Sequence, residues 1–467
     1  MMKKKRWKNL AILVVVIMMI CGCNGADGSK LDMGQSGNTE KNSAGGTEKY
    51  QITVGWNENL VPQLLNAAMV EFNKTNPDYE VVIQHYDWQT GQEQLEMELA
   101  MGKGPDLFDM DMVYANKLAE KGLIEDLSTY LADGQGLERE NIVGAVVQCN
   151  TMEGVLTCVP ARFYLEIMLG KKSLIGDESS WTVDEFLKCV KENEGMQIGN
   201  GNRWFRNSET DNQYSIIEAA FHTNVEHFID KEKRQANFKN EEFCNLLEFA
   251  KRYETDSFDY DTDKEFWLQV KDEELLLCQN QLDSVEDYML SLSVLGKEAQ
   301  YIGYPTYDGS TCYGISNYVA CGMNPNSQVK DGAWAFIEFL IQYRFEDDMF
   351  EHGFFSEISG LEAQFSEAMV KEYSKAPEGV EPVELPKWNI GYGNGQVIAE
   401  AYAATQEDID ALKKLIDGAS YVYNAGSNSI YAIVQEETYG YLNGDKSVEE
   451  TVDIIQNRVQ LYLDEQN

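Results

Sequence analysis

Two kinds of hydrophobic pattern alternate along the chain from about residue 49 onward. Short β-type runs cover residues 50–54, 81–83 and 107–108, and Gly55 ends the first of them. Between and after these runs, apolar residues recur at helical spacing over residues 64–72, 95–99 and 118–127. Strands that alternate with helices at this interval predict βαβ units, a parallel sheet and therefore an α/β fold.

Helix start signals continue the pattern through the second half of the chain. Thr182 with Glu185, and Ser447 with Glu450, have the spacing of capping boxes at helix N-termini. The last helix turns an apolar face to the core through Val452, Ile455 and Val459. The roughly 420 residues after the N-terminal region are too many for one typical core, so we expect two domains or lobes.

The N-terminus predicts export from the cytoplasm. Five basic residues within the first eight precede an unbroken apolar run from Leu10 to Ile20. As a helix this run rises only ~17 Å, against a bilayer core of ~30 Å, so it is typical of a secretory signal and not of a permanent span.

Cys23 is the predicted attachment point of a lipid anchor. The run ends in Ile20, Cys21, Gly22 and Cys23, which resembles a bacterial lipobox, although Cys21 is an unusual residue at its position. The resemblance implies a signal peptide over residues 1–22 and acyl chains such as palmitate on Cys23. Residues 24–48 have almost no apolar side chains, so segment 23–48 is predicted to be a flexible tether. The alternative is an ordinary cleaved signal that leaves Cys23 free.

Charge narrows the possible partners. The full chain carries a net charge of −40, and cleavage after residue 22 would leave 33 basic against 78 acidic residues, a net charge of −45. Such acidity argues against nucleic acid and against an anionic membrane surface, so membrane contact is expected through the lipid anchor only. The seven cysteines after Cys23 are scattered and odd in number, which does not indicate a disulfide framework.

Four segments together resemble the family 1 extracellular solute-binding proteins, the maltose-binding-protein-like sugar receptors of bacterial ABC transporters. They are Ala68–Pro77, Met101–Asp109, Gly154–Pro160 and Asn326–Leu340, and in the last of them Gly332 stands where the family has alanine. The family resemblance implies a two-lobed periplasmic-binding-protein type II fold. Each lobe would be a mostly parallel sheet flanked by helices, with the ligand cleft between the lobes.

By match to the family, residues 49–161 and 311–345 form the N-terminal lobe, and residues 162–310 and 350–465 form the C-terminal lobe. The implied function is the receptor of an ABC importer, which binds a mono- to oligosaccharide and delivers it to the transmembrane permease. Ligand binding would close the lobes, because a ligand that touches both lobes favours the closed state. We expect a monomer on the outer side of the cell membrane, as in Gram-positive bacteria.

Sugar recognition needs aromatic platforms and planar polar side chains, and in α/β sheets these stand beyond the carboxyl ends of strands. The first-lobe candidates after the three predicted strands are Trp56, Asn57, Tyr86, Trp88, Asp109 and Asp111. Polar residues follow Trp56 at once, so we expect it outside the ordinary core. Trp88 has the alternative role of pinning its loop, and Asp109 that of capping the following helix.

Further candidates lie at the crossing between the lobes and in the second lobe. Tyr164 follows Pro160 at the crossing, with core packing as its alternative, and Arg162 is expected either at the ligand or in a hinge salt bridge. Asn317 and Tyr318 lie on the return to the first lobe. Trp388 stands in a glycine-flanked aromatic loop, and Trp204 with Phe205 lies between polar residues.

Enzyme and metal motifs are absent from the sequence. It contains no G-x-S-x-G, H-E-x-x-H or P-loop pattern. Asp259, Asp261 and Asp263 alternate as in a calcium loop, but Lys264 replaces the required glycine and Val270 the final glutamate. We therefore expect no metal, no cofactor and no catalysis. Two alternatives stay open: a surface glycosidase that uses acids such as Asp109 and Asp111, and a ligand-sensing subunit.

Overall fold

The computed structural model describes the chain from residue 49 to residue 465, with gaps. The described ranges are 49–132, 136–199, 211–230, 232–253, 266–345, 352–370, 388–391, 397–401, 403–423 and 429–465, all within the unit Lys41–Asn467. The predicted signal peptide, Cys23 and its tether, Trp204 with Phe205, and the acidic loop at residues 259–263 lie outside these ranges. For Trp388 only the backbone is described.

The first sheet has four strands in the order β13-β3-β1-β2. They are β1 (Tyr50–Asn57), β2 (Tyr79–Tyr86), β3 (Leu107–Asp109) and β13 (Cys321–Met323). β1 is parallel to both β2 and β3, which confirms the predicted parallel sheet, and β13 is antiparallel to β3. The prediction that Gly55 ends β1 is wrong, since the strand continues to Asn57. Gly55 instead allows close packing, because a Cβ there would lie 2.8 Å from Pro105 Cγ and from Tyr86 Cε2.

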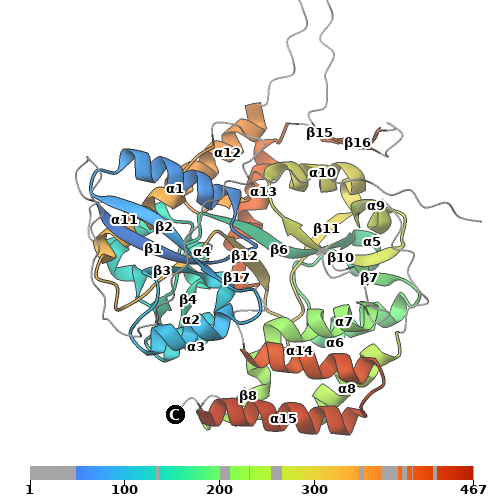
Figure 1. Cartoon of the computed structure of the whole chain (residues 1–467). Helices are drawn as coiled ribbons and strands as arrows, with labels where there is room; N and C mark the ends of the chain where they lie inside the picture. Colours follow the sequence, from blue (N-terminus) through green and yellow to red (C-terminus); the bar gives the residue numbers. More distant parts are fainter. Residues whose placement is uncertain are drawn as a thin grey trace, which may run out of the picture. The chain divides into compact units, whose positions relative to one another are not determined.

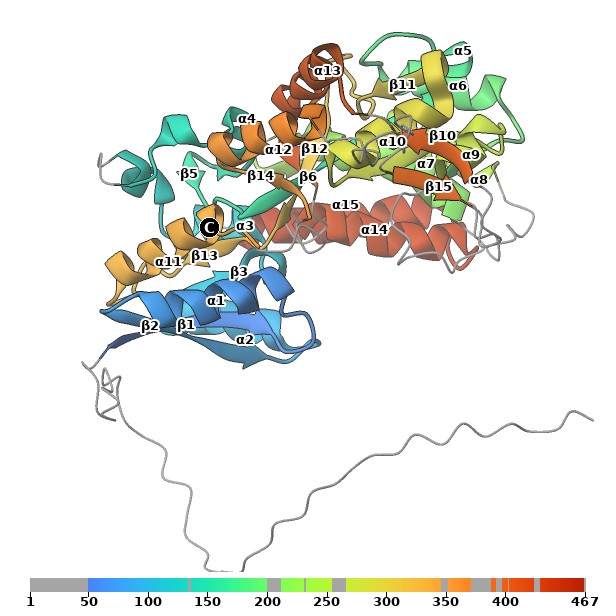
Figure 2. The same cartoon turned by 90° about the horizontal axis from the view of Figure 1, so that it is seen from above.

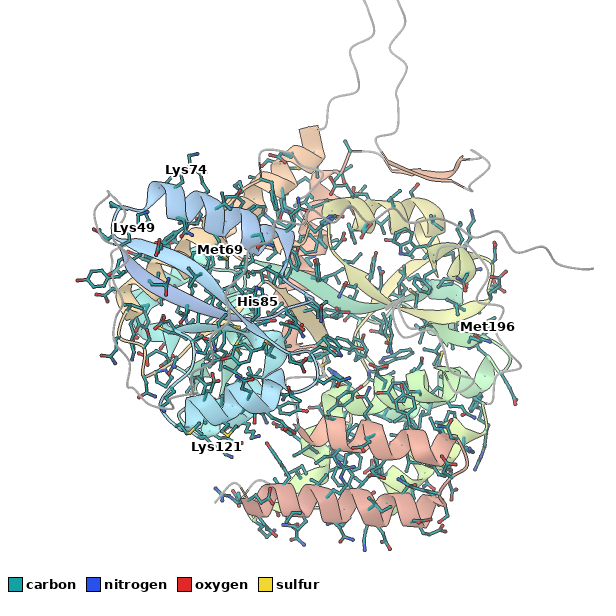
Figure 3. All side chains as sticks on the ribbon, viewed as in Figure 1. Lys49, Met69, Lys74, His85, Lys121 and Met196 are labelled. Carbon is teal, nitrogen blue, oxygen red and sulfur yellow. The ribbon has the colours of Figure 1, made fainter. Side chains whose placement is uncertain are left out.

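Helices and short turns lie between and after these strands along the chain. They are α1 (Gln63–Thr75), α2 (Gly91–Ala100), η1 (Met110–Met112), α3 (Ala115–Glu120), η2 (Leu127–Ala132), η3 (Arg139–Asn141), α4 (Gly144–Cys149), the β4 (Thr151–Met152) and β5 (Val155–Leu156) hairpin, and α11 (Lys330–Gln342). α1 turns Met69 toward the core and Lys74 to solvent (Figure 3). The helix predicted over residues 118–127 is wrong, because Gly122 at φ +62° separates α3 from η2.

Gly332 in α11 explains the departure from the family's alanine. A Cβ at this position would lie 2.3 Å from Cδ1 of Tyr79 at the start of β2. Distances below 3.0 Å are essentially never found for real Cβ contacts, so the ring or the helix would have to move. The glycine costs some helix propensity and lets α11 approach β2 closely.

The second sheet is built on the ten-residue strand β6 (Arg162–Lys171), with the order β17-β12-β6-β10-β7. Its other strands are β7 (Gln197–Gly199), β10 (Leu275–Leu282), β11 (Ala299–Ile302), β12 (Tyr313–Tyr318), β14 (Phe354–Phe355) and β17 (Ala419–Val422). β10, β11, β12 and β14 are all antiparallel to β6. A mostly parallel sheet is therefore wrong for this half of the chain, where the sheet is mixed.

The path back to the first sheet begins later than the family match implies. β12 pairs with β6 over residues 314–318, so it belongs to the second sheet. β13 is the first strand after it that pairs within the first sheet. The predicted return near residue 311 is thus displaced to the connection between Tyr318 and Cys321, whereas the full lobe boundaries stay a prediction.

Helices lie on both faces of the second sheet, α9 and α10 on one and α6, α7 and α14 on the other (Figure 1). The elements around the sheet are α5 (Lys172–Ile175), α6 (Val183–Glu192), α7 (Asp211–Phe221), η5 (His222–Phe228), β8 (Ile229–Asp230), β9 (Gln235–Ala236), α8 (Glu241–Lys251), α9 (Phe266–Lys271), α10 (Val285–Leu295), η6 (Gly296–Glu298), α12 (Ile358–Val370), β15 (Trp388–Gly391), β16 (Val397–Ala401), α13 (Gln406–Asp417), α14 (Ser429–Leu442) and α15 (Val448–Glu465). α14 and α15 run side by side (Figure 1), and seen from above one overlies the other (Figure 2).

The predicted caps and the predicted face of the last helix are present. Thr182 and Glu185 form a complete capping box at α6, and Ser447 Oγ accepts from the Glu450 N–H at 3.1 Å before α15. Val452, Ile455 and Val459 are buried. Within the described residues, no helix combines the length and apolar character that a membrane span requires.

Arg162 anchors the beginning of β6. Its side chain is 0% exposed, and its guanidinium donates to the carbonyl oxygens of Ala161 at 2.8 Å and Tyr343 at 2.6 Å. The guanidinium also lies 3.3 Å from the ring centroid of Phe355. These contacts join β6 to the residues after α11 and to β14, so Arg162 has a structural role and presents no surface to a ligand in this conformation.

Candidate functional site

The predicted first-lobe residues stand where the strands end, as expected, but several are buried. Asn57 pairs in register with Tyr86, so the ends of β1 and β2 are adjacent. Trp56 is only 2% exposed, belongs to the apolar core and donates its indole N–H to the Leu60 carbonyl at 3.1 Å. The expectation that Trp56 stands outside the core is therefore wrong, because its carbonyl partner satisfies its one polar atom.

Tyr86 and Asn57 are also engaged in internal contacts. The Tyr86 hydroxyl donates to Glu98 Oε2 at 2.6 Å and accepts from Gln84 Nε2 at 2.9 Å, and burial raises the pKa of this phenol. Asn57 is 7% exposed, and its Oδ1 accepts from the Asn59 N–H at 3.1 Å. Both side chains shape the sheet edge, and their contact with a ligand stays a prediction.

Trp88 is the exposed aromatic residue of this edge, with 62% of its surface accessible. Its loop is held by Asp87, whose carboxylate accepts from the N–H groups of Gln89 at 2.9 Å and Thr90 at 3.0 Å. These backbone hydrogen bonds lower the pKa of Asp87. Because Asp87 fixes the loop, the alternative role of Trp88 as its pin loses support, and the indole face is available to a ligand.

Asp109 and Asp111 form a short acidic turn at the end of β3. Asp109 is 5% exposed, and its carboxylate accepts from the Asp111 N–H at 3.1 Å. This hydrogen bond caps η1, which is the alternative role predicted for Asp109. Burial raises the pKa of Asp109, and the Asp111 charge adds to this effect. Asp111 is exposed. Capping and ligand contact are compatible for Asp109, because a carboxylate accepts several hydrogen bonds.

Tyr164 and Tyr318 lie together on the second sheet. Their ring centroids are 5.5 Å apart, and both side chains are half-buried. Asn317 points to the opposite face of β12, since successive strand residues alternate. There its Nδ2 donates to Asn150 Oδ1 at 2.7 Å. Asn317 and Tyr318, which were predicted together, therefore lie on opposite faces of the sheet. Tyr318 stands beside Tyr164, and Asn317 is hydrogen-bonded to Asn150.

Glu166 is the central residue to which the sequence analysis assigned no role. It is 5% exposed and accepts from Gln281 Nε2 at 2.6 Å and from Ser316 Oγ at 2.5 Å. Burial raises the pKa of Glu166 to about 7. We call the side chains that share this side of the sheet the β6 polar face: Tyr164, Glu166, Gln281, Ser316 and Tyr318.

A second buried carboxylate adjoins this face. Glu218 on α7 accepts from the hydroxyl groups of Tyr423 at 2.5 Å and Tyr431 at 3.3 Å, and burial raises its pKa. Ser316 Oγ also lies 3.1 Å from the main-chain carbonyl oxygen of Tyr423, so the residue whose ring hydroxyl reaches Glu218 stands next to the hydroxyl group that serves Glu166. Nothing local marks residues 218, 423 and 431, since they come together only in the fold. The signal for Glu166 was its period-two position with Tyr164 on one strand.

The chemistry of these groups suits a ligand rich in hydroxyls. Carboxylate and amide oxygens accept hydrogen bonds, amide and phenol groups donate them, and tyrosine rings cover C–H faces. Among the described residues, no group of three or more His, Cys, Asp or Glu side chains could hold a metal ion. None of the seven described cysteines forms a disulfide, and five of them are buried.

The fold is that of the two-lobed periplasmic binding proteins. The sugar-binding protein MalE from Xanthomonas citri aligns with a TM-score of 0.54 and 13% identity over 89% of this chain and 98% of its own. An ABC substrate-binding protein from Listeria monocytogenes in complex with cycloalternan aligns with a TM-score of 0.50 and 15% identity over 89% of this chain and 99% of its own.

The sequence itself assigns the family. Residues 67–378 match the family model described as bacterial extracellular solute-binding protein, and this chain belongs to that family. The family is one of receptors that bind solutes outside the cytoplasm and is not an enzyme family. A comparison with curated protein sequences finds no match.

The raised pKa of Glu166 predicts a pH-dependent effect on stability. The folded pKa of about 7 lies above the ordinary glutamate pKa of 4.5, so the folded state retains a proton that the unfolded state releases between these two pH values. Glu166 therefore costs stability as pH rises from 4.5 to 7, by roughly 3 kcal/mol in full. The free energy of unfolding of Glu166→Gln, relative to that of the wild type, should therefore increase by about this amount as the pH rises from 4 to 8. Urea unfolding at each pH measures this difference.

The matched control is Glu93→Gln on the exposed side of α2, which removes a carboxylate without changing this network. A Glu166→Gln variant whose free energy of unfolding follows the wild type at a constant offset across this pH range would show that Glu166 is not held in a desolvated site.

Proposed function

We propose that this protein is the carbohydrate receptor of an ABC importer. It binds a mono- to oligosaccharide reversibly, as a monomer, and delivers the sugar unchanged to the permease. The observation that carries the proposal is the β6 polar face, where the rings of Tyr164 and Tyr318 stand beside the hydrogen-bonded Glu166, Gln281 and Ser316. Rings and paired polar groups are the two elements that sugar recognition requires.

The family supports the ligand class. Its members bind solutes outside the cytoplasm, and two proteins of similar fold are described as sugar-binding or as a complex with cycloalternan. The large excess of acidic residues, with a net charge of −40, disfavours phosphorylated or sulfated sugars as ligands. Neutral oligosaccharides are therefore the first candidates.

The ligand would contact residues from both sheets. The exposed ring of Trp88 and the carboxylates of Asp109 and Asp111 stand at the end of the first sheet, and Tyr164 and Tyr318 belong to the β6 polar face. A ligand that touches both halves binds the closed arrangement preferentially, which shifts the population toward it. A permease that recognises the closed arrangement would then receive only loaded receptors.

A lipid anchor would keep this receptor at the membrane. The proposal rests on the basic and apolar N-terminus followed by Cys23, with diacylglycerol on the Cys23 sulfur and the polar segment 24–48 as the tether. Cys23→Ala should abolish incorporation of labelled palmitate and shift the protein from the membrane fraction to the medium. Retention of both label and membrane association in this variant would contradict the anchor.

The ligand class is tested by calorimetric titration and thermal shift of the mature protein with a panel of neutral oligosaccharides. We expect at least one sugar to raise the melting temperature without appearance of a hydrolysis product, since the ligand binds only the folded state. Trp88→Ala should lower the affinity for that sugar about 10-fold, as expected for loss of one stacking ring. The melting temperature of the free protein should not change.

The matched control is Val70→Ala on α1, which removes another exposed apolar side chain, 68% accessible, away from the sheet edge. Its affinity should equal that of the wild type. Hydrolysis of the sugar by the purified protein would favour the glycosidase alternative, and a panel without any binding would remove the support for a carbohydrate ligand.

A further inference from the structure

Several buried polar atoms near Glu166 make no hydrogen bond within the described part of the chain. They are the hydroxyl groups of Tyr304 and Tyr421, Nδ1 of His222 and both amide atoms of Gln279. Tyr304 is 0% exposed and Gln279 is 3% exposed. Burial lowers the pKa of His222 to about 3, so its imidazole is neutral.

The register of the second sheet brings one of these groups, the Tyr421 hydroxyl, near Glu166. Gln281 on β10 and Gly314 on β12 are both paired with Glu166, and Tyr421 on β17 is paired with Gly314. A Cβ on Gly314 would lie 2.8 Å from Cζ and 2.9 Å from Oη of Tyr421. The ring and the hydroxyl of Tyr421 therefore lie over Gly314, the residue that is paired with Glu166.

The remaining groups join the same cluster through ring contacts. The Tyr304 centroid lies 6.1 Å from that of Tyr421 and 5.9 Å from that of Tyr423. His222 lies 5.4 Å from Tyr421 and 4.4 Å from Tyr423. Gln279 is on the same face of β10 as Gln281, because strand residues two apart share a face. These atoms of Tyr304, Tyr421, His222 and Gln279 therefore gather beside the β6 polar face, although other buried polar atoms without a partner lie elsewhere in the described part of the chain.

Packing does not account for this cluster. Each buried polar atom left without a partner costs about 1–3 kcal/mol, and phenylalanine would fill the space of a tyrosine without that cost. Several such atoms in one cluster are accounted for if a bound ligand supplies their hydrogen-bond partners. The β6 polar face beside this cluster meets solvent at the exposed Gln281 and at the half-buried Tyr164 and Tyr318.

We propose that Tyr304, Tyr421, His222 and Gln279 form an inner subsite beside Glu166 that binds one terminal, uncharged, polyhydroxylated unit of the ligand. This inference rests on the proposed sugar-binding function. Ligand hydroxyls donate to Glu166 and Nδ1 of His222 and accept from the tyrosine hydroxyls and the Gln279 amide. The protein thus holds a sugar by its end, and the unmade hydrogen bonds of the free protein are completed in the complex.

Single-atom variants test the inner subsite. Tyr304→Phe and Tyr421→Phe each remove one hydroxyl and leave the ring. We expect both variants of the mature protein to unfold at the same or a higher urea concentration than the wild type when free of ligand. We expect their affinity for the best-bound oligosaccharide of the neutral panel to fall about 10-fold, as for one lost hydrogen bond to a buried group.

Tyr301→Phe is the matched control on β11, because its buried hydroxyl pairs with Ser291 Oγ. This variant should lose stability and keep the wild-type affinity. If Tyr304→Phe and Tyr421→Phe instead lose stability and bind sugar as the wild type does, their hydroxyls serve only the folded protein, and the inner subsite is refuted.

The stability measurement also separates the two proposals. If the wild type binds no sugar of the panel, the sugar assignment fails on its own. In that case a loss of stability in Tyr304→Phe still refutes the subsite, and a gain still supports a site for another hydrogen-bonding ligand.

Discussion

The whole arrangement depends on the burial of Glu166 in the middle of strand β6. The opposite side of this strand, with Phe163, Leu165, Ile167 and Leu169, belongs to the largest apolar core. A carboxyl group can occupy the other side only because Ser316 and Gln281 donate to it from the two neighbouring strands. The same donors that make its burial tolerable fix the orientation of the carboxyl group beside the tyrosines. Stability and recognition therefore share one set of contacts.

This constraint also explains the positions of the glycine and the arginine around β6. Gly314 leaves room for the Tyr421 ring beside Glu166, and any larger residue would push that ring away. Arg162 holds the first residue of the strand through backbone carbonyls of Ala161 and Tyr343. A strand fixed at its start and paired on both sides presents its polar face as a rigid surface, which lowers the ordering cost of binding.

Local patterns predicted the first sheet and the caps well. The runs around Ile52, Val81 and Leu107 are strands of one parallel sheet, and Thr182 and Ser447 begin helices. The second sheet was not predictable in the same way, because its strands are far apart in the chain, from β6 at Arg162–Lys171 to β17 at Ala419–Val422. Hydrophobic periodicity predicts that a segment is a strand, but it contains no information on which strand lies beside it or in which direction.

The candidate site shows the same division. Position after a strand predicted Trp88 and Asp111 as accessible, but it did not reveal that Trp56, Tyr86 and Asn57 have internal hydrogen-bond partners. The resemblance led to Tyr164 and Tyr318, and the fold brings these two rings together and adds Glu166 beside them. Unmade hydrogen bonds, such as that of Tyr304, exist only in three dimensions.

Hydrogen–deuterium exchange of the mature protein with and without a bound oligosaccharide tests the central claim most directly. The account predicts slower exchange in the peptides that contain residues 162–168, 314–318 and 86–90 when sugar is present. Unchanged exchange in all three, with protection elsewhere in the chain, would contradict a ligand site on β6.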